Sequence, residues 1–213
     1  QVKVRGDGDL FYTPGGDPLV VDLAGDGLSA GEFAPVIGAY DINLDGQADT
    51  VYMPVGSTVG LLVFDAAGDN FASVSQLSFK DHIFSEYFEF GGKYARSSLE
   101  AISFLDSNSD GVVDSADKRF SDIYVWTDLD DKGVLNANEL GQTVSSIDLT
   151  NILVAPQSGA GSNAPDVFRT AEIQVNGTKK TLYEVALDHA LNKDHLKIDT
   201  DEDGIPDAPP FTA

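Results

Sequence analysis

The stretch from Asp106 to Asp117 has the ligand spacing of a twelve-residue EF-hand calcium loop. Oxygen-bearing side chains stand at positions 1, 3, 5, 9 and 12, and Gly111 stands at position 6, where the sharp turn needs its conformational freedom. Oxygens at these positions converge on one side of the turn, where a hard cation such as Ca²⁺ can be coordinated. The predicted ligands are Asp106, Asn108, Asp110, Val112 through its carbonyl, Asp114 and Asp117.

A second loop, from Asp128 to Glu139, repeats this spacing with Glu139 at position 12, where a bidentate carboxylate is usual. The departure is Lys132 at position 5, which removes one side-chain oxygen. A calcium site is therefore predicted, with a turn that holds no metal as the alternative. The residues assigned to this site are Asp128, Asp130, Lys132, Val134, Asn136 and Glu139.

Two further acidic loops match the first half of the pattern but lack an acidic group at position 12. Both would need ligands from water, backbone or a distant carboxylate, as in calcium loops that are not EF-hands. The residues assigned to them are Asp41, Asn43, Asp45 and Asp49 in one loop, and Asp199, Asp201, Asp203, Ile205 and Asp207 in the other.

The weakest matches replace the position 3 ligand with alanine. Asp22 and Asp26 flank Ala24, and we expect this loop to bind calcium only with outside help. Asp65 and Asp69 flank Ala67, where a plain turn is the better interpretation.

The charge composition supports calcium as the counter-ion. The chain of 213 residues has a formal net charge of −22, and its acidic residues divide into 27 Asp and 8 Glu. Aspartate is the residue that tight metal-binding turns prefer. Such a charge repels phosphate, so it excludes binding to nucleic acid or insertion into an anionic membrane. The absence of cysteine excludes disulfides, thiolate metal sites and a cysteine nucleophile.

Short apolar strands are expected beside these loops, at residues 19–21, 51–53, 60–64 and 123–126. Residues 171–175 and 181–185 alternate around Asn176-Gly177, which predicts a hairpin. Ser97 followed by Glu100 predicts a capped helix from Ser98 to Leu105. The predicted fold class is α+β: a β-rich, calcium-stabilised module with short helices and EF-hand-like acidic loops.

Composition divides the chain into three parts. Residues 1–17 are rich in Gly and Asp and are interpreted as an arm or linker. Residues 18–190 are expected to form the calcium-dependent ligand-binding module, and residues 191–213 an acidic calcium loop with an exit linker. The chain is expected to be a monomeric module within a longer protein.

The order of motifs between Asp17 and Leu149 carries a family resemblance. These motifs are DPLVVDLAGDG at 17–27, YDINLDG at 40–46, GLLVFD at 60–65, LDSNSDG at 105–111 and VWTDLD at 125–130. They resemble the calcium-dependent modules of giant bacterial RTX proteins, namely the self-processing modules and the related peptide-binding domains of RTX adhesins. The resemblance implies a secreted or surface-anchored bacterial protein in which calcium is a structural ion.

The two groups of relatives imply two functions. The favoured one is a non-enzymatic module that binds a peptide or protein, expected to present a free C-terminal carboxylate, in adhesion to cells or surfaces. The sequence does not locate that ligand site, although five aromatic residues offer contacts: Phe84, Tyr87, Phe88, Phe90 and Tyr94.

The alternative is calcium-triggered cleavage of the Asp17–Pro18 bond. The Asp17 carboxylate would attack its own carbonyl carbon to form a cyclic anhydride, and the nitrogen of Pro18 would leave once protonated. Departures from the family pattern place this second: Ala24, Ala66 and Ala67 replace polar residues, and QLSFKDH at 76–82 replaces an acidic segment.

Overall fold

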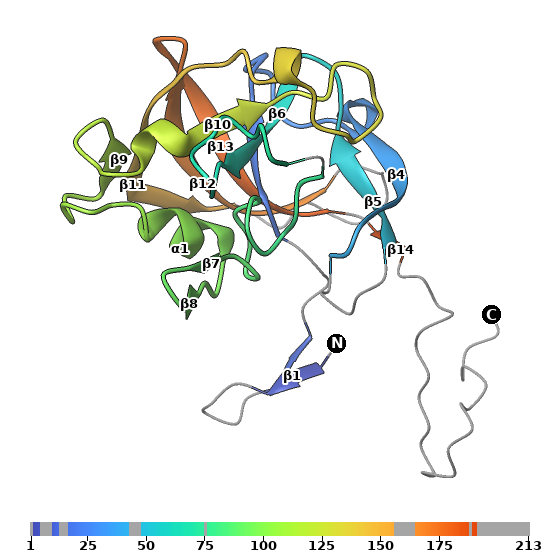
Figure 1. The fold of residues 1–213 in the computed structure, drawn as a ribbon, viewed down its shortest axis with the longest axis horizontal. Helices are drawn as coiled ribbons and strands as arrows, with labels where there is room; N and C mark the ends of the chain where they lie inside the picture. The colour runs from blue at the N-terminus through green and yellow to red at the C-terminus, as the bar shows by residue number, and fades with distance from the viewer. Residues whose placement is uncertain are drawn as a thin grey trace.

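The computed structural model of the chain describes residues 2–4, 10–12, 17–42, 48–74, 76–155, 165–187 and 189–190. Its main element is a seven-stranded sheet in which every neighbouring pair of strands is antiparallel. Figure 1 shows this sheet curled into an open half-barrel. In sheet order the strands are β10 (Ile123–Trp126), β6 (Val59–Phe64), β3 (Leu19–Asp22), β13 (Thr178–Ala186), β12 (Asp166–Val175), β11 (Val144–Val154) and β9 (Val112–Asp114).

Smaller sheets complete the described strands. A three-stranded sheet joins β14 (His189–Ala190), β5 (Asp49–Pro54) and β4 (Phe33–Tyr40), and β5 lies between the other two. Two short hairpins are β1 (Val2–Val4) with β2 (Leu10–Tyr12), and β7 (Glu89–Phe90) with β8 (Lys93–Tyr94).

The predicted α+β class is wrong, because the described chain is an antiparallel β-protein with very little helix. Its one α-helix, α1 (Ser98–Ser103), has 6 residues, and each 3₁₀-helix has 3. Antiparallel neighbours can be joined by tight turns, whereas parallel neighbours need long crossovers that are usually helical. Strands β12 and β13, for example, are joined by the two-residue turn Asn176-Gly177 and need no helical crossover. The 3₁₀-helices are η1 (Ala30–Glu32), η2 (Phe120–Asp122) and η3 (Ala137–Glu139).

Strands β3 and β6 are buried on both faces. Along β3, Leu19 and Val21 face one core and Val20 faces the other, and β6 alternates in the same way. A strand covered on both sides needs apolar residues at every position, which is why β3 and β6 appear in the sequence as continuous apolar runs. The segment at 123–126, which becomes β10, packs beside β6 as an edge strand of the sheet.

Two local predictions are confirmed. Asn176 and Gly177 have positive φ values of 50° and 72°, as a two-residue hairpin turn between β12 and β13 requires. Helix α1 begins at Ser98, and the Ser97 hydroxyl accepts a hydrogen bond from the Glu100 amide at 3.1 Å. The helix ends at Ser103, earlier than predicted, and continues as single turns.

Candidate functional site

The loop after β10 gathers three carboxylates. Ligand oxygens of Asp128, Asp130 and Glu139 all lie within 4.8 Å of one another, and within the described ranges no other group of three Asp, Glu, His or Cys residues does this. Asp128 and Glu139 are buried, whereas Asp130 is exposed. Burial raises the pKa of Asp128, and the nearby Glu139 and Asp130 add to the rise. Crowded oxygen donors of this kind fit a hard cation such as Ca²⁺.

Hydrogen bonds within this loop fix the carboxylates in place. Asp128 accepts from the backbone amides of Lys132 at 3.1 Å and Gly133 at 2.6 Å. Glu139 accepts from the Trp126 indole at 3.0 Å and from the Leu129 amide at 3.0 Å. The loop is therefore tied to the core through Trp126, the one buried tryptophan of the sheet.

Lys132, which the sequence places at a ligand position, contributes a cation instead of an oxygen. Its Nζ lies 2.6 Å from Asp130 Oδ2, and this contact is the first cause of the lowered pKa of Asp130. The pair is exposed, so it holds Asp130 only weakly. Of the other two assigned residues, Val134 accepts a hydrogen bond at its carbonyl from the Asn136 side chain at 3.1 Å.

The loop at 106–117 turns its carboxylates toward its own backbone. Asp106 accepts from the Gly111 amide at 2.9 Å, and Asp117 accepts from the amides of Ser107 at 2.6 Å and Asp114 at 3.0 Å. Partial burial opposes ionisation of Asp117, but these hydrogen bonds together lower its pKa. Asn108, Asp110 and Val112 line the same turn, where Asp110 accepts from the Asn108 side chain at 2.9 Å and from the Val112 amide at 2.9 Å.

The two loops share an unusual backbone path. At position 4, Ser109 and Asp131 have φ values of 60° and 57°, and at position 6, Gly111 and Gly133 have φ values of 85° and 65°. Left-handed φ is rare for residues other than glycine, so its recurrence at the same two positions is not incidental. The sequence spacing thus produces the same turn twice.

The remaining predicted sites are described only in part. Asp22 is buried and accepts from the amides of Gly25 at 2.6 Å and Gly27 at 2.8 Å, while Asp26 is exposed. Asp49 is buried and accepts from the Ile42 amide at 3.3 Å. Asp41 is half-buried. The assigned residues that lie outside the described residues are Asn43, Asp45, Asp199, Asp201, Asp203, Ile205 and Asp207.

The Asp17–Pro18 bond is held from both sides. The Asp17 amide donates to Glu86 Oε2 at 2.9 Å, and the Pro18 carbonyl accepts from the Val185 amide at 3.1 Å. Pro18 is buried and leads directly into β3. The bond is therefore anchored to the core of the sheet, although the sequence suggested a linker at this point.

The Asp17 side chain has a strongly raised pKa. Burial raises its pKa to about 8, and the nearby carboxylates of Glu86 and Glu184 add to the rise, while Arg169 opposes it. Its Oδ1 atom is buried and has no hydrogen-bond partner among the described residues. At neutral pH the folded chain therefore keeps a proton on Asp17.

A buried Glu184, paired with the half-buried Arg169, lies beside Asp17. Glu184 accepts from the Ser98 amide at 3.1 Å and the Ser98 hydroxyl at 2.9 Å, and it pairs with Arg169 Nε. These contacts link β13, β12 and the start of α1. No spacing in the sequence relates Asp17, Glu86, Arg169 and Glu184, so the sequence offered no signal for this cluster.

The aromatic residues proposed as ligand contacts belong mostly to the core. Phe84, Tyr87 and Phe88 are buried, Phe90 packs against the core, and Tyr94 is 61 % exposed. Within the described residues no helix is long and apolar enough to cross a membrane.

Comparison with known proteins places this arrangement in a family. A family model described as the SPM domain matches residues 19–188. The iron-regulated protein FrpA of Neisseria meningitidis serogroup C is similar to this chain, with 32% identity over 124 residues. That match covers 58% of this chain and 11% of FrpA, so the chain corresponds to a small part of that relative.

Proposed function

We propose that this chain, which belongs to the SPM domain family, is a calcium-dependent module that cleaves its own Asp17–Pro18 peptide bond. The observation that carries the proposal is the buried Asp17 carboxyl, with a pKa raised to about 8, at an anchored Asp–Pro bond. Perturbed pKa values of this size cluster at functional sites. The sequence alone favours peptide binding over cleavage. The surroundings of Asp17 in the fold favour cleavage.

A protonated Asp17 can supply both the attacking atom and the proton. One carboxyl oxygen bonds to the Asp17 carbonyl carbon, the carboxyl proton passes to the Pro18 nitrogen, and the C–N bond breaks. The products are a cyclic anhydride at Asp17 and a new amino terminus at Pro18. Water then opens the anhydride, so the net reaction is hydrolysis of one amide. Because attack is intramolecular, its rate depends on how firmly the bond is positioned.

The neighbours of Asp17 position the bond and set the pKa of the Asp17 carboxyl. Glu86 fixes the Asp17 amide and adds to the rise in the Asp17 pKa. Arg169 opposes that rise, but its Nε is engaged by Glu184, whose buried carboxylate also faces Asp17. The Val185 amide holds the Pro18 carbonyl on the other side of the bond. Asp17 is thereby kept neutral and close to its own backbone.

Calcium fits the loop carboxylates and would promote cleavage indirectly, by stabilising the fold. Asp128, Asp130 and Glu139 would hold one ion, and the loop at 106–117 would hold another through Asp106, Asn108 and Asp110. Bound calcium supplies the positive charge that offsets repulsion among these groups.

The topology of the sheet separates the loop at 128–139 from the Asp17–Pro18 bond. Strands β3 and β10 both run antiparallel to β6, so they share one direction. Asp17 precedes β3 whereas Asp128 follows β10, which places these two residues at opposite ends of the sheet. The four residues of β3 that lie between these two ends span about 13 Å. The residues around Asp17, rather than an ion held by Asp128, therefore act on the bond.

Mass spectrometry of the full chain tests the proposal. In millimolar calcium a fragment beginning at Pro18 should accumulate, and EGTA should prevent it. Asp17→Asn should remove the fragment, whereas Asp166→Asn, the same change at an exposed position, should not. The rate should be flat near pH 6 to 7 and fall above about pH 8, as the proton leaves Asp17. Cleavage that persists in Asp17→Asn would overturn the proposal.

Glu86→Gln provides a second readout. Removing this carboxylate lowers the Asp17 pKa, because Glu86 is one of the charges that raise it. The fall in rate should therefore begin at a lower pH than in the unchanged chain. An unaltered pH profile would contradict the role given to Glu86.

Peptide binding in adhesion, a bacterial surface or secreted location, and membership of an RTX protein stay predictions from the sequence. FrpA similarity supports the last of these only as a likeness, since this chain covers a small share of that protein.

A further inference from the structure

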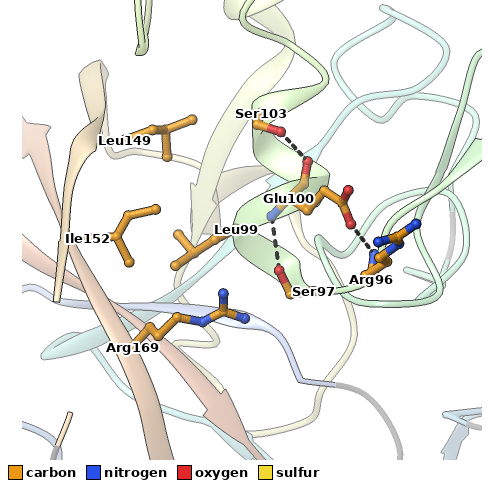
Figure 2. A pocket seen from close by; sticks show the side chains of 8 residues that line it. All are labelled: Arg96, Ser97, Leu99, Glu100, Ser103, Leu149, Ile152 and Arg169. Carbon is orange, nitrogen blue, oxygen red and sulfur yellow. Dashed lines mark hydrogen bonds between the residues drawn. The ribbon is translucent and has the colours of Figure 1, made fainter. Parts of the chain in front are cut away.

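A cavity of about 520 Å³ opens between α1 and the β11–β12 edge of the main sheet. Figure 2 shows Leu99 on α1 facing Leu149 and Ile152 on β11, with Arg169 of β12 below them. Leu99 is buried and Leu149 packs against the core, while Ile152 is 39% exposed. One wall is thus apolar and reachable from solvent.

The cavity also gathers arginine side chains, which are scarce on this acidic protein. The chain has 4 arginines among its 213 residues, and 2 of them, Arg96 and Arg169, line this cavity. The guanidinium of Arg96 is exposed and has no hydrogen bond to a described residue, and Arg169 uses only its Nε, for Glu184. Glu100 is the one acidic residue among those that line the cavity, and it accepts from the Arg96 backbone amide at 2.6 Å. Free guanidinium donors suit a carboxylate.

Strand β11 offers an open edge beside the cavity. Its outer neighbour β9 pairs with Ser146, Ile147 and Asp148, and the Leu149 amide donates to the Gly111 carbonyl at 2.9 Å. Beyond Leu149 no described strand pairs with that edge. Three apolar side chains follow on this segment, namely Ile152, Leu153 and Val154, exposed by 39%, 58% and 82%. An open apolar edge is a template for an added strand.

We propose that this cavity and edge bind an extended peptide that ends in a free carboxylate. The peptide adds a strand to β11 beyond Leu149, its last apolar side chain enters the cavity between Leu99 and Ile152, and its carboxylate meets Arg96 with Arg169 alongside. Backbone pairing supplies affinity, and the cavity and arginines supply selectivity. The site does not depend on cleavage of Asp17–Pro18, so the two proposals can fail separately.

Charge and strand geometry together favour this occupant. The net charge of −22 repels ligands with several negative charges. A ligand with a single carboxylate, bound beside two arginines, meets less repulsion. A second copy of the chain could pair through the same edge, but it would bring another acidic surface with it. Dimer formation is therefore the competing outcome of the test.

Fluorescence polarisation with a defined probe pair tests the site. The probe is the strand-forming pentapeptide Val-Thr-Val-Thr-Leu, labelled at its amino end and ending in either a free acid or an amide. We expect the acid to bind at least about tenfold more tightly than the amide, because charge-assisted hydrogen bonds are lost on amidation. Equal affinity of the two, or no binding of either, would overturn the proposal.

Matched variants assign the effect to residues. Arg96→Gln should bind acid and amide alike, whereas Lys93→Gln, which removes the same charge from exposed β8, should keep the preference. Ile152→Thr should weaken both peptides, and Val154→Thr, outside the cavity, should not weaken them as much. If Arg96→Gln keeps the full preference, the carboxylate is not held here.

Two measurements separate the competing explanations. N-methylation of alternate peptide amides should abolish binding if a strand is added to β11, and retained binding would contradict edge pairing. A concentration-dependent dimer, dispersed by Ile152→Lys in sedimentation, would assign the edge to self-association and overturn the peptide proposal. Mass spectrometry of each binding sample shows whether the Asp17–Pro18 bond is intact, which keeps this result apart from cleavage.

Discussion

Replacing Asp17 with asparagine should make the chain more stable at neutral pH. The folded-state pKa of Asp17 is about 8 against an ordinary value of 3.8, so folding requires this carboxyl to hold a proton that the unfolded chain has released. Below the ordinary pKa both states are protonated and nothing is lost. Stability then declines as the pH rises, until the folded-state pKa is reached.

The expected size follows from this shift. Each pH unit between the two pKa values corresponds to about 1.4 kcal/mol, so at pH 7 the penalty is up to about 4 kcal/mol. Asparagine has nearly the same shape and no charge to bury, so it avoids the penalty. The gain from Asp17→Asn should be near zero at pH 4 and approach that value at pH 7.

Urea unfolding followed by the fluorescence of the buried Trp126 measures this gain. Curves for Asp17→Asn and the unchanged chain are compared at each pH in fixed calcium, which cancels the titration of the loop carboxylates. Mass spectrometry must show that the unchanged chain is intact in each sample. Asp166→Asn is the control, with no pH-dependent gain expected. A gain that does not vary with pH, or a loss at pH 7, would refute the burial argument.

The remaining predictions concern the acidic loops. Terbium bound in the second loop should luminesce when the chain's single tryptophan is excited, and Asp128→Asn should reduce this signal far more than Asp131→Asn, because Asp131 is not at a ligand position. Chelation should lower the melting temperature of the unchanged chain, and identical melting in excess EGTA would remove calcium from the account of the fold. Gly133→Ala should lower the free energy of unfolding by about 1–3 kcal/mol, because its Cβ would lie 2.6 Å from Val36 methyls at a φ of +65°, whereas Gly141→Ala has open space around it and should be nearly neutral.

Local features were predictable because their causes are local. The apolar runs at 19–21 and 60–64 became β3 and β6, since strands buried on both faces leave no polar position in the sequence. Asn176-Gly177 and Ser97 set a turn and a helix start through their own backbone and side-chain preferences. The repeated spacing of the two central acidic loops likewise produced one backbone path twice.

Strand β11 was not predicted from the sequence. Its sequence, VSSIDLTNILV, mixes apolar and polar residues without a clear alternation, and its pairing with β12 shifts register after Asp148. A bulge breaks the two-residue period on which strand prediction depends. Strand β11 is therefore absent from the strands that the sequence predicted.

The acidic loops, the buried strands and the Asp–Pro bond can be recognised from the amino-acid sequence. The surroundings of that bond and the position of the cavity depend on how the chain folds. Glu86, Arg169 and Glu184 are 69, 152 and 167 positions from Asp17 in the chain, and only the folding of the sheet brings their charges to bear on its carboxyl. A pKa depends on burial and on charges that are close in space, so the residues that set it cannot be identified from their positions along the chain.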